Sequence, residues 1–157
     1  MSTIVQLNDI VDALEMQFEE SVALLDLDSG QVQHIELSLL SAAEERDEDS
    51  EDEPKLLAWE EDQWELAKEI ASSDRFIRLP TKFDVHDWQI MQDFTHSVES
   101  EHIRRDLERA IHGAGAFRHF KDTIRRHLIE EAWFAFHRDA LRDIAIEWCE
   151  DHDIKWS

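Results

Sequence analysis

The residues from 129 to 148 carry the longest regular pattern of apolar side chains in the chain. Six of them follow one another at intervals of three or four residues: Ile129, Trp133, Phe136, Ala140, Ile144 and Trp148. This spacing aligns side chains along one face of an α-helix, whereas the side chains of a strand alternate every two residues. The pattern therefore predicts a long C-terminal helix at about 129–150 that packs along one side.

The composition favours helices over the rest of the chain as well. The 157 residues include three Gly and two Pro, too few for the many tight turns of a β-sandwich or a β-barrel. Six Trp and eight Phe supply large apolar side chains, so the chain is not a wholly disordered acidic polypeptide. We therefore expect a single domain, residues 1–157, of the α+β class and mostly helical.

A small antiparallel sheet is predicted in the N-terminal half. Two apolar-rich runs, Ser21–Leu27 and Gln31–Leu37, flank the sequence Asp28-Ser29-Gly30, where Gly can adopt the positive φ of a hairpin turn. Arg75–Leu79 alternates between polar and apolar residues and stops at Pro80. This segment is the predicted third strand of the sheet.

Short helices are predicted around these strands. Asn8 is placed to cap a short N-terminal helix at 9–17, and a second helix is expected at 37–45. A third is expected at about 58–72, where four residues share one face: Trp59, Gln63, Leu66 and Ile70.

A C-terminal bundle of about four helices is predicted after Pro80, ending with the long helix described above. Asp84 is expected to cap the first helix of the bundle, and Gly113 to end the second. The predicted apolar faces are Trp88, Met91, Phe94 and Val98 in the first helix, Ile103, Leu107, Ala110 and Ile111 in the second, and Phe117, Phe120 and Ile124 in the third.

The net charge of −22 is unevenly distributed. Residues 1–74 hold 22 acidic and three basic side chains, whereas residues 104–142 hold nine basic and six acidic ones. The densest acidic run, Glu44–Glu53, has eight carboxylates in ten residues, which predicts an acidic mobile linker at 44–54. Either the two halves neutralise each other on folding, or the basic stretch is an interaction surface.

Several protein classes are disfavoured by the same features. Cys149 is the only cysteine and cannot form an intramolecular disulfide, and no secretory signal opens the sequence. No apolar run approaches the roughly 20 residues that cross a bilayer. A chain this negative repels phosphate backbones and anionic lipids. We therefore expect a cytoplasmic protein that does not bind membranes, and nucleic acid is a disfavoured partner.

Five short motifs mark the second half of the sequence. They are LPTKFD at 79–84, MQDF at 91–94, AIHGAGAFRHFKD at 110–122, WFAF at 133–136 and AIEW at 145–148. Together they resemble the uncharacterised protein family UPF0158 of bacteria, most specifically in the run Gly-x-Gly-Ala-Phe-Arg-x-Phe-Lys-Asp. The resemblance covers most of the chain and implies a bacterial cytosolic protein. It implies no activity, cofactor or catalytic residue.

The same run contains the candidate anion or partner site. Gly113 and Gly115 form a Gly-x-Gly turn at the start of a predicted helix, where free backbone N–H groups favour an anion. Arg118, Lys121 and Arg125 follow at positions that project from one helix face. The run is neither a dinucleotide-binding fingerprint nor a P-loop. The alternative is that Gly113 caps a helix, Gly115 permits close packing and the basic face pairs with the acidic half.

The nine histidines do not form a recognisable metal motif. Glu99 and His102 give one Glu-x-x-His pair, but the second copy that a di-iron bundle needs is missing. One Cys, no CxxC and no HExxH leave no closed zinc set, and the run DLDSG at 26–30 is read as a hairpin turn instead of a calcium loop. Cys149 is expected to be a buried inert thiol. The sequence therefore indicates no metal, no cofactor and no catalytic residue.

Three functional hypotheses follow. The leading one is a non-catalytic interaction or regulatory protein whose partner is another protein or an anionic ligand. The second is a small-ligand-binding or enzymatic domain, which requires a concave pocket at 113–125 with Arg118 or Lys121 pointing into it. The third is nucleic-acid association through 104–142, or nucleic-acid mimicry by the acidic half. Association with a second copy of the chain is left open.

Overall fold

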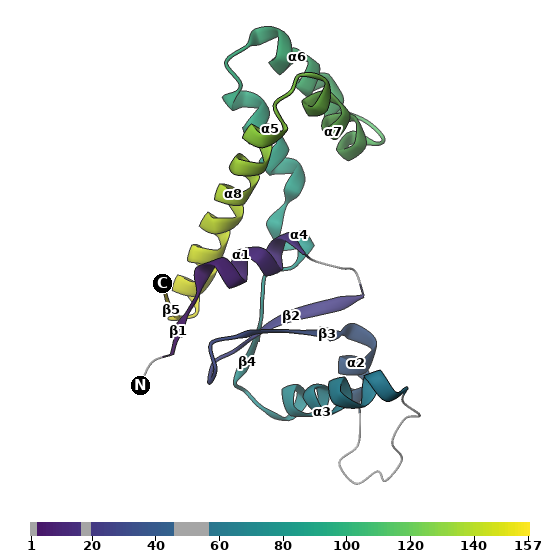
Figure 1. Ribbon diagram of the computed structural model, residues 1–157, viewed down its shortest axis with the longest axis vertical. Coiled ribbons are helices and arrows are strands. Elements are labelled where there is room, and N and C mark those ends of the chain that lie inside the picture. The colour runs from purple at the N-terminus through teal and green to yellow at the C-terminus, as the bar shows by residue number, and fades with distance from the viewer. Residues whose placement is uncertain (1–2, 17–19, 46–56) are drawn as a thin grey trace.

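The computed structural model describes residues 3–16, 20–45 and 57–157. A small sheet and two helices form one end of an elongated molecule, and a bundle of helices extends from them to the other end (Figure 1). The fold is of the mostly helical α+β class, as the sequence predicts.

The three-stranded sheet is antiparallel and follows the predicted hairpin. Strand β2 (Ser21–Asp26) lies between β3 (Val32–Glu36) and β4 (Phe76–Arg78), with Leu24 opposite both Gln33 and Arg78. The turn uses Gly30 at φ 73°, where a Cβ would meet the Thr3 methyl group at 2.7 Å. The turn therefore requires glycine for both its backbone conformation and its close contact.

Alternate residues of the sheet face two different hydrophobic cores. Leu25 and Ile77 belong to the larger core, with the N-terminal helix and the bundle. Leu24 and Ile35 belong to a smaller one, with the two helices on the opposite face. Successive side chains of a strand point to opposite faces of the sheet, and here both faces carry apolar side chains. Helices therefore cover the sheet on both sides.

Three helices pack against this sheet. The structure corrects the predicted N-cap of the first helix and the predicted buried face of the third. Helix α1 spans Leu7–Glu15 with Gln6 as its N-cap, so Asn8 is a helical residue and not the cap. Helices α2 (Leu37–Glu45) and α3 (Ala58–Ser72) begin and end where predicted. The buried face of α3 is displaced from the predicted one, because its most buried residues are Trp64, Ala67 and Ile70. Of the predicted linker at 44–54, the first two residues end α2, and the rest lies outside the described residues.

The bundle contains four helices after a short helical turn. The turn is α4 (Lys82–Val85), and the helices are α5 (Asp87–Ser97), α6 (Glu101–Ala110), α7 (Ala116–Arg126) and α8 (Glu130–Asp151).

Asp84 does not cap the first helix of the bundle. It is the third residue of α4, where Thr81 is the N-cap, and the two residues exchange hydrogen bonds in a capping box. Helix α5 begins only at Asp87, and its N-cap is His86, whose backbone adopts the left-handed conformation at φ 53°. The predicted start was wrong because the chain turns sharply at His86 between two helices.

An aromatic cluster holds the far end of the bundle together. Phe94 of α5, Phe120 of α7 and Trp133 of α8 meet edge to face, with ring centroids 4.8–6.2 Å apart. Phe120 is completely buried. Phe117, predicted to share its apolar face, is instead 48% exposed.

The two termini of the described chain are joined by a strand pairing that no pattern in the sequence predicts. Strand β1 (Ile4–Val5) runs parallel to β5 (Lys155–Trp156), as Figure 1 shows. Arg138 on α8 adds a second link to the N-terminal region by donating hydrogen bonds to Asp12 at 3.1 Å and Glu15 at 3.0 Å.

Candidate functional site

The candidate site lies on α7, at the end of the molecule away from α2 and α3 (Figure 1). Gly113 has φ 95° and Gly115 has φ 75°, so both adopt backbone conformations that L side chains rarely reach. Gly115 is the N-cap of α7, and it offers no side chain to its first turn, which also lacks an acidic residue. The break between α6 and α7 therefore depends on glycine at both positions.

Arg118, Lys121 and Arg125 are all exposed on α7. Arg125 forms an ion pair with Glu130 at 3.4 Å, the first residue of α8. Within the described part of the chain, neither Arg118 nor Lys121 has an ion-pair partner. Phe117 lies one turn before Lys121, so the exposed face combines an aromatic ring with three cations.

Three other basic residues of this end pair locally, and Arg105 does so with Glu101 at 2.7 Å. Arg109 and Arg126 both approach Asp106 of α6, at 3.8 and 3.3 Å. In the described residues, the cation from 104–142 that reaches the N-terminal half is Arg138, through Asp12 and Glu15. The face formed by Arg118, Lys121 and Arg125 is therefore not neutralised by the described acidic residues of the N-terminal half.

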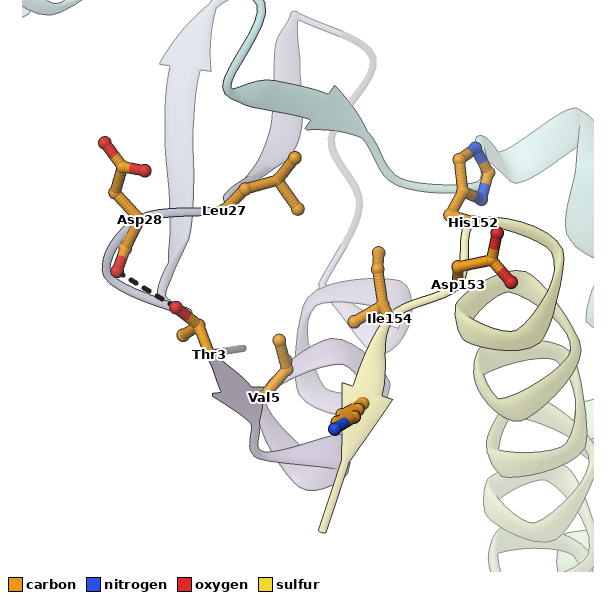
Figure 2. Close-up of a pocket in the computed structure, with 8 residues that line it drawn as sticks. Thr3, Val5, Leu27, Asp28, His152, Asp153 and Ile154 are labelled. Atoms are coloured by element: carbon orange, nitrogen blue, oxygen red, sulfur yellow. Dashed lines mark hydrogen bonds between the residues drawn. The ribbon is translucent and has the colours of Figure 1, made fainter. Parts of the chain in front are cut away.

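A pocket of about 490 Å³ lies far from α7. It is lined by β1, the β2–β3 turn and the segment that follows α8. Figure 2 shows Val5, Leu27 and Ile154 facing its interior, whereas the carboxylates of Asp28 and Asp153 point away on opposite sides. Its polar groups do not converge on one point, so the pocket lacks the arrangement that orients a reacting ligand.

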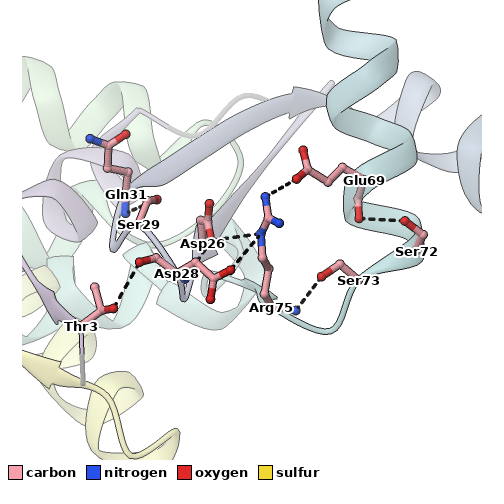
Figure 3. A network of polar contacts seen from close by, with 9 residues as sticks. All are labelled: Thr3, Asp26, Asp28, Ser29, Gln31, Glu69, Ser72, Ser73 and Arg75. Atoms are coloured by element: carbon pink, nitrogen blue, oxygen red, sulfur yellow. Dashed lines mark hydrogen bonds and ion pairs between the residues drawn. The ribbon is translucent and has the colours of Figure 1, made fainter. Parts of the chain in front are cut away.

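A polar network beside this pocket has a structural role. Arg75 approaches Asp26 at 3.3 Å and Asp28 at 3.9 Å, and it donates to Glu69 of α3 (Figure 3). Desolvation is the largest single effect on its pKa and lowers it, but the hydrogen bond and charge of Glu69 together with the charges of Asp26 and Asp28 outweigh desolvation, so the pKa of Arg75 is raised. Arg75 thus joins the hairpin turn to the end of α3 and the start of β4.

Cys149 is fully buried on α8, and burial raises the pKa of its thiol to about 11. A thiol with so high a pKa is protonated at neutral pH and is a poor nucleophile. No helix in the described ranges is both long enough and apolar enough to cross a membrane.

The structure also brings together three residues that no sequence motif connects. His102 and Asp106 of α6 lie beside His127, the C-cap of α7. The pair Glu99 and His102 does not share a helix face, because α6 begins at Glu101 after its N-cap Ser100. The spacing of His102 and Asp106 was visible in the sequence, but their proximity to His127 depends on how α6 packs against α7.

Comparison with known proteins identifies the family. The model of the uncharacterised protein family UPF0158 matches residues 2–157. The chain belongs to this family. A curated relative, the UPF0158 protein PA5073 of Pseudomonas aeruginosa, is 32% identical over 68 residues, which cover 42% of this chain and 44% of the relative. The chain thus matches less than half of that UPF0158 relative's length. No solved structure matches the chain significantly.

Proposed function

We propose that this UPF0158 protein is a non-catalytic, cytoplasmic interaction protein that binds an acidic partner protein through α7. The observation that carries the proposal is that Arg118 and Lys121 lie on one exposed face of α7 together with the half-exposed Phe117, and neither cation has an ion-pair partner in the described part of the chain. In a chain of net charge −22, a cationic face attracts negative groups that the rest of the surface repels.

The chemistry of the face suits a protein partner. Phe117, 48% exposed, lies one turn before Lys121, and the fully buried Phe120 anchors the same helix. Aromatic and Arg side chains are enriched at protein interfaces, where the ring supplies apolar contact and the guanidinium binds carboxylates in pairs. The rigid attachment of α7 lowers the entropic cost of binding.

The test compares two double variants with the same change of charge. Arg118→Gln/Lys121→Gln removes the exposed cations of α7, and Arg142→Gln/Lys155→Gln removes one Arg and one Lys that are exposed elsewhere without an ion-pair partner in the described residues. Each tagged protein is used to capture partners from an extract of its native cells, and bound proteins are quantified by mass spectrometry.

We expect captured acidic proteins to be lost from the α7 variant and retained by the control variant. Both variants should keep the parent urea midpoint, because exposed charges contribute only about 0–1 kcal/mol each. An identical set of captured proteins from the parent and both variants would overturn the proposal.

A further inference from the structure

Two imidazoles and one carboxylate meet where α6 packs against the end of α7. Their ligand atoms, one from each of His102, Asp106 and His127, all lie within 4.8 Å of one another. We propose that these three residues bind one divalent cation of the late first-row metals, such as Zn²⁺, and thereby tie α6 to α7. This proposal is independent of the partner-binding face.

The distances are close to those of a tetrahedral site. The His127 Nε2 atom lies 2.8 Å from Asp106 Oδ2, and the His102 Nε2 atom lies 3.8 Å from the same oxygen. Zinc–ligand bonds of about 2.0–2.1 Å place neighbouring tetrahedral ligand atoms about 3.3 Å apart. The His127–Asp106 distance must therefore lengthen and the His102–Asp106 distance must shorten, each by about half an ångström. The third distance, between the two imidazole nitrogens, is no greater than 4.8 Å and must reach the same value of about 3.3 Å.

The three side chains differ in their freedom to make this adjustment. Asp106 and His127 are each only 15% exposed, so the packing of α6 and α7 restrains them. His102 is 81% exposed and can rotate toward them. The imidazole rings of His102 and His127 are almost perpendicular, at 89°, with centroids 5.7 Å apart. The restrained pair forms a fixed half of the site, and the exposed histidine closes it.

The ligand set selects the metal. Imidazole nitrogens suit Zn²⁺, Co²⁺ and Ni²⁺, whereas Mg²⁺ and Ca²⁺ prefer oxygen ligands. Three protein ligands leave the fourth tetrahedral position to a water molecule, which the exposed side of His102 admits. For Nε2 of His127 to bind the metal, the neutral imidazole must carry its proton on Nδ1, and the metal then takes the place of the hydrogen bond between His127 and Asp106.

Two arginines oppose the cation and must move. Arg126 lies 3.3 Å from Asp106 Oδ2, and Arg109 lies 3.8 Å from Oδ1. Their side chains are 65% and 78% exposed, so water can solvate both guanidinium groups when they swing away from Asp106. The metal then replaces weak, exposed ion pairs with direct coordination, and the net charge of −22 favours cation uptake at long range.

Zinc titration of the full chain tests the proposal. Calorimetry is performed in excess Mg²⁺, which occupies the many carboxylates without competing for imidazoles. We expect one equivalent of Zn²⁺ to bind the parent. The His102→Gln variant should bind it at least about tenfold more weakly, since even residues that only support metal ligands change affinity by 10–100-fold.

His96→Gln is the matched control, because His96 is an exposed helical histidine on α5, outside the cluster. This variant should bind Zn²⁺ like the parent. At the same Zn²⁺ concentration, the melting temperature should rise by equal amounts in the parent and the control, and by less in His102→Gln. Since His102 is exposed, its replacement should leave the fold intact. Absence of one-to-one binding, or equal affinity in the parent and His102→Gln, would show a hydrogen-bonded cluster only and overturn the proposal.

Discussion

Replacing Phe120 by Ala tests the aromatic cluster that supports the far end of the molecule. Phe120 is 0% exposed, and its ring lies 6.2 Å from that of Phe94 and 4.8 Å from that of Trp133. The change removes a buried ring that joins α7 to α5 and α8.

The expected cost follows from burial and ring geometry. Truncating a buried Phe to Ala costs about 3–5 kcal/mol, because apolar burial is lost and a cavity remains. Each of the two edge-to-face contacts contributes about 0.5–1.5 kcal/mol beyond burial, which places this site in the upper part of that range. For a chain of this size, where 1 kcal/mol corresponds to about 2–4 °C, a cost of about 4–5 kcal/mol should lower the melting temperature by roughly 8–20 °C.

Urea unfolding monitored by far-UV circular dichroism and tryptophan fluorescence measures this effect, because Trp133 reports directly on the cluster. Phe134→Ala is the control: this ring is on the neighbouring helix α8 and is 60% exposed, so its loss should change stability by less than about 0.5 kcal/mol. A cost below about 1.5 kcal/mol for Phe120→Ala, or an equal cost for the two variants, would refute the packing described for α7.

Three further outcomes are expected. Burial raises the pKa of Cys149 to about 11 from an ordinary 9.0, so at pH 8 its thiol should react with a disulfide reagent about 100-fold more slowly in the folded protein than in urea; the absorbance of the released thiol, followed over time, measures both rates. Leu128 is 90% exposed with φ 58°, so Leu128→Gly should raise the free energy of unfolding by up to about 1 kcal/mol in urea titrations; a loss would reveal a stabilising contact of the Leu128 side chain. The pKa of Asp84 is lowered by the backbone N–H and the hydroxyl of Thr81, so its stabilising effect is present above its unfolded pKa and is lost as the pH falls through its folded pKa. The melting temperature should consequently fall more steeply for the parent than for Asp84→Asn from about pH 5 toward pH 3, and parallel curves would contradict this.

Periodicity predicted the elements but not all of their buried faces. The hairpin and the helices at 37–45 and 58–72 were predicted because alternation and helical spacing are local properties of a sequence. The predicted buried face of α3 is wrong. Gln63 and Leu66 fit a regular helical spacing, but the residues that immediately follow them, Trp64 and Ala67, are the ones that pack into the core. Phe117 was likewise predicted to be buried, but the position of α7 leaves it exposed.

The sequence by itself determined the helix-rich α+β class, the family and the basic run of α7, because composition, short-range spacing and motifs are fully contained in the order of residues. Only the tertiary structure decided two further features. One is which cations lack ion-pair partners among the described residues, and the other is the proximity of His102 and Asp106 to His127. His102 and His127 are 25 positions apart in the sequence, and the packing of α6 against α7 brings them together. Such packing depends on the summed burial of many side chains, and local periodicity does not encode which helices become neighbours.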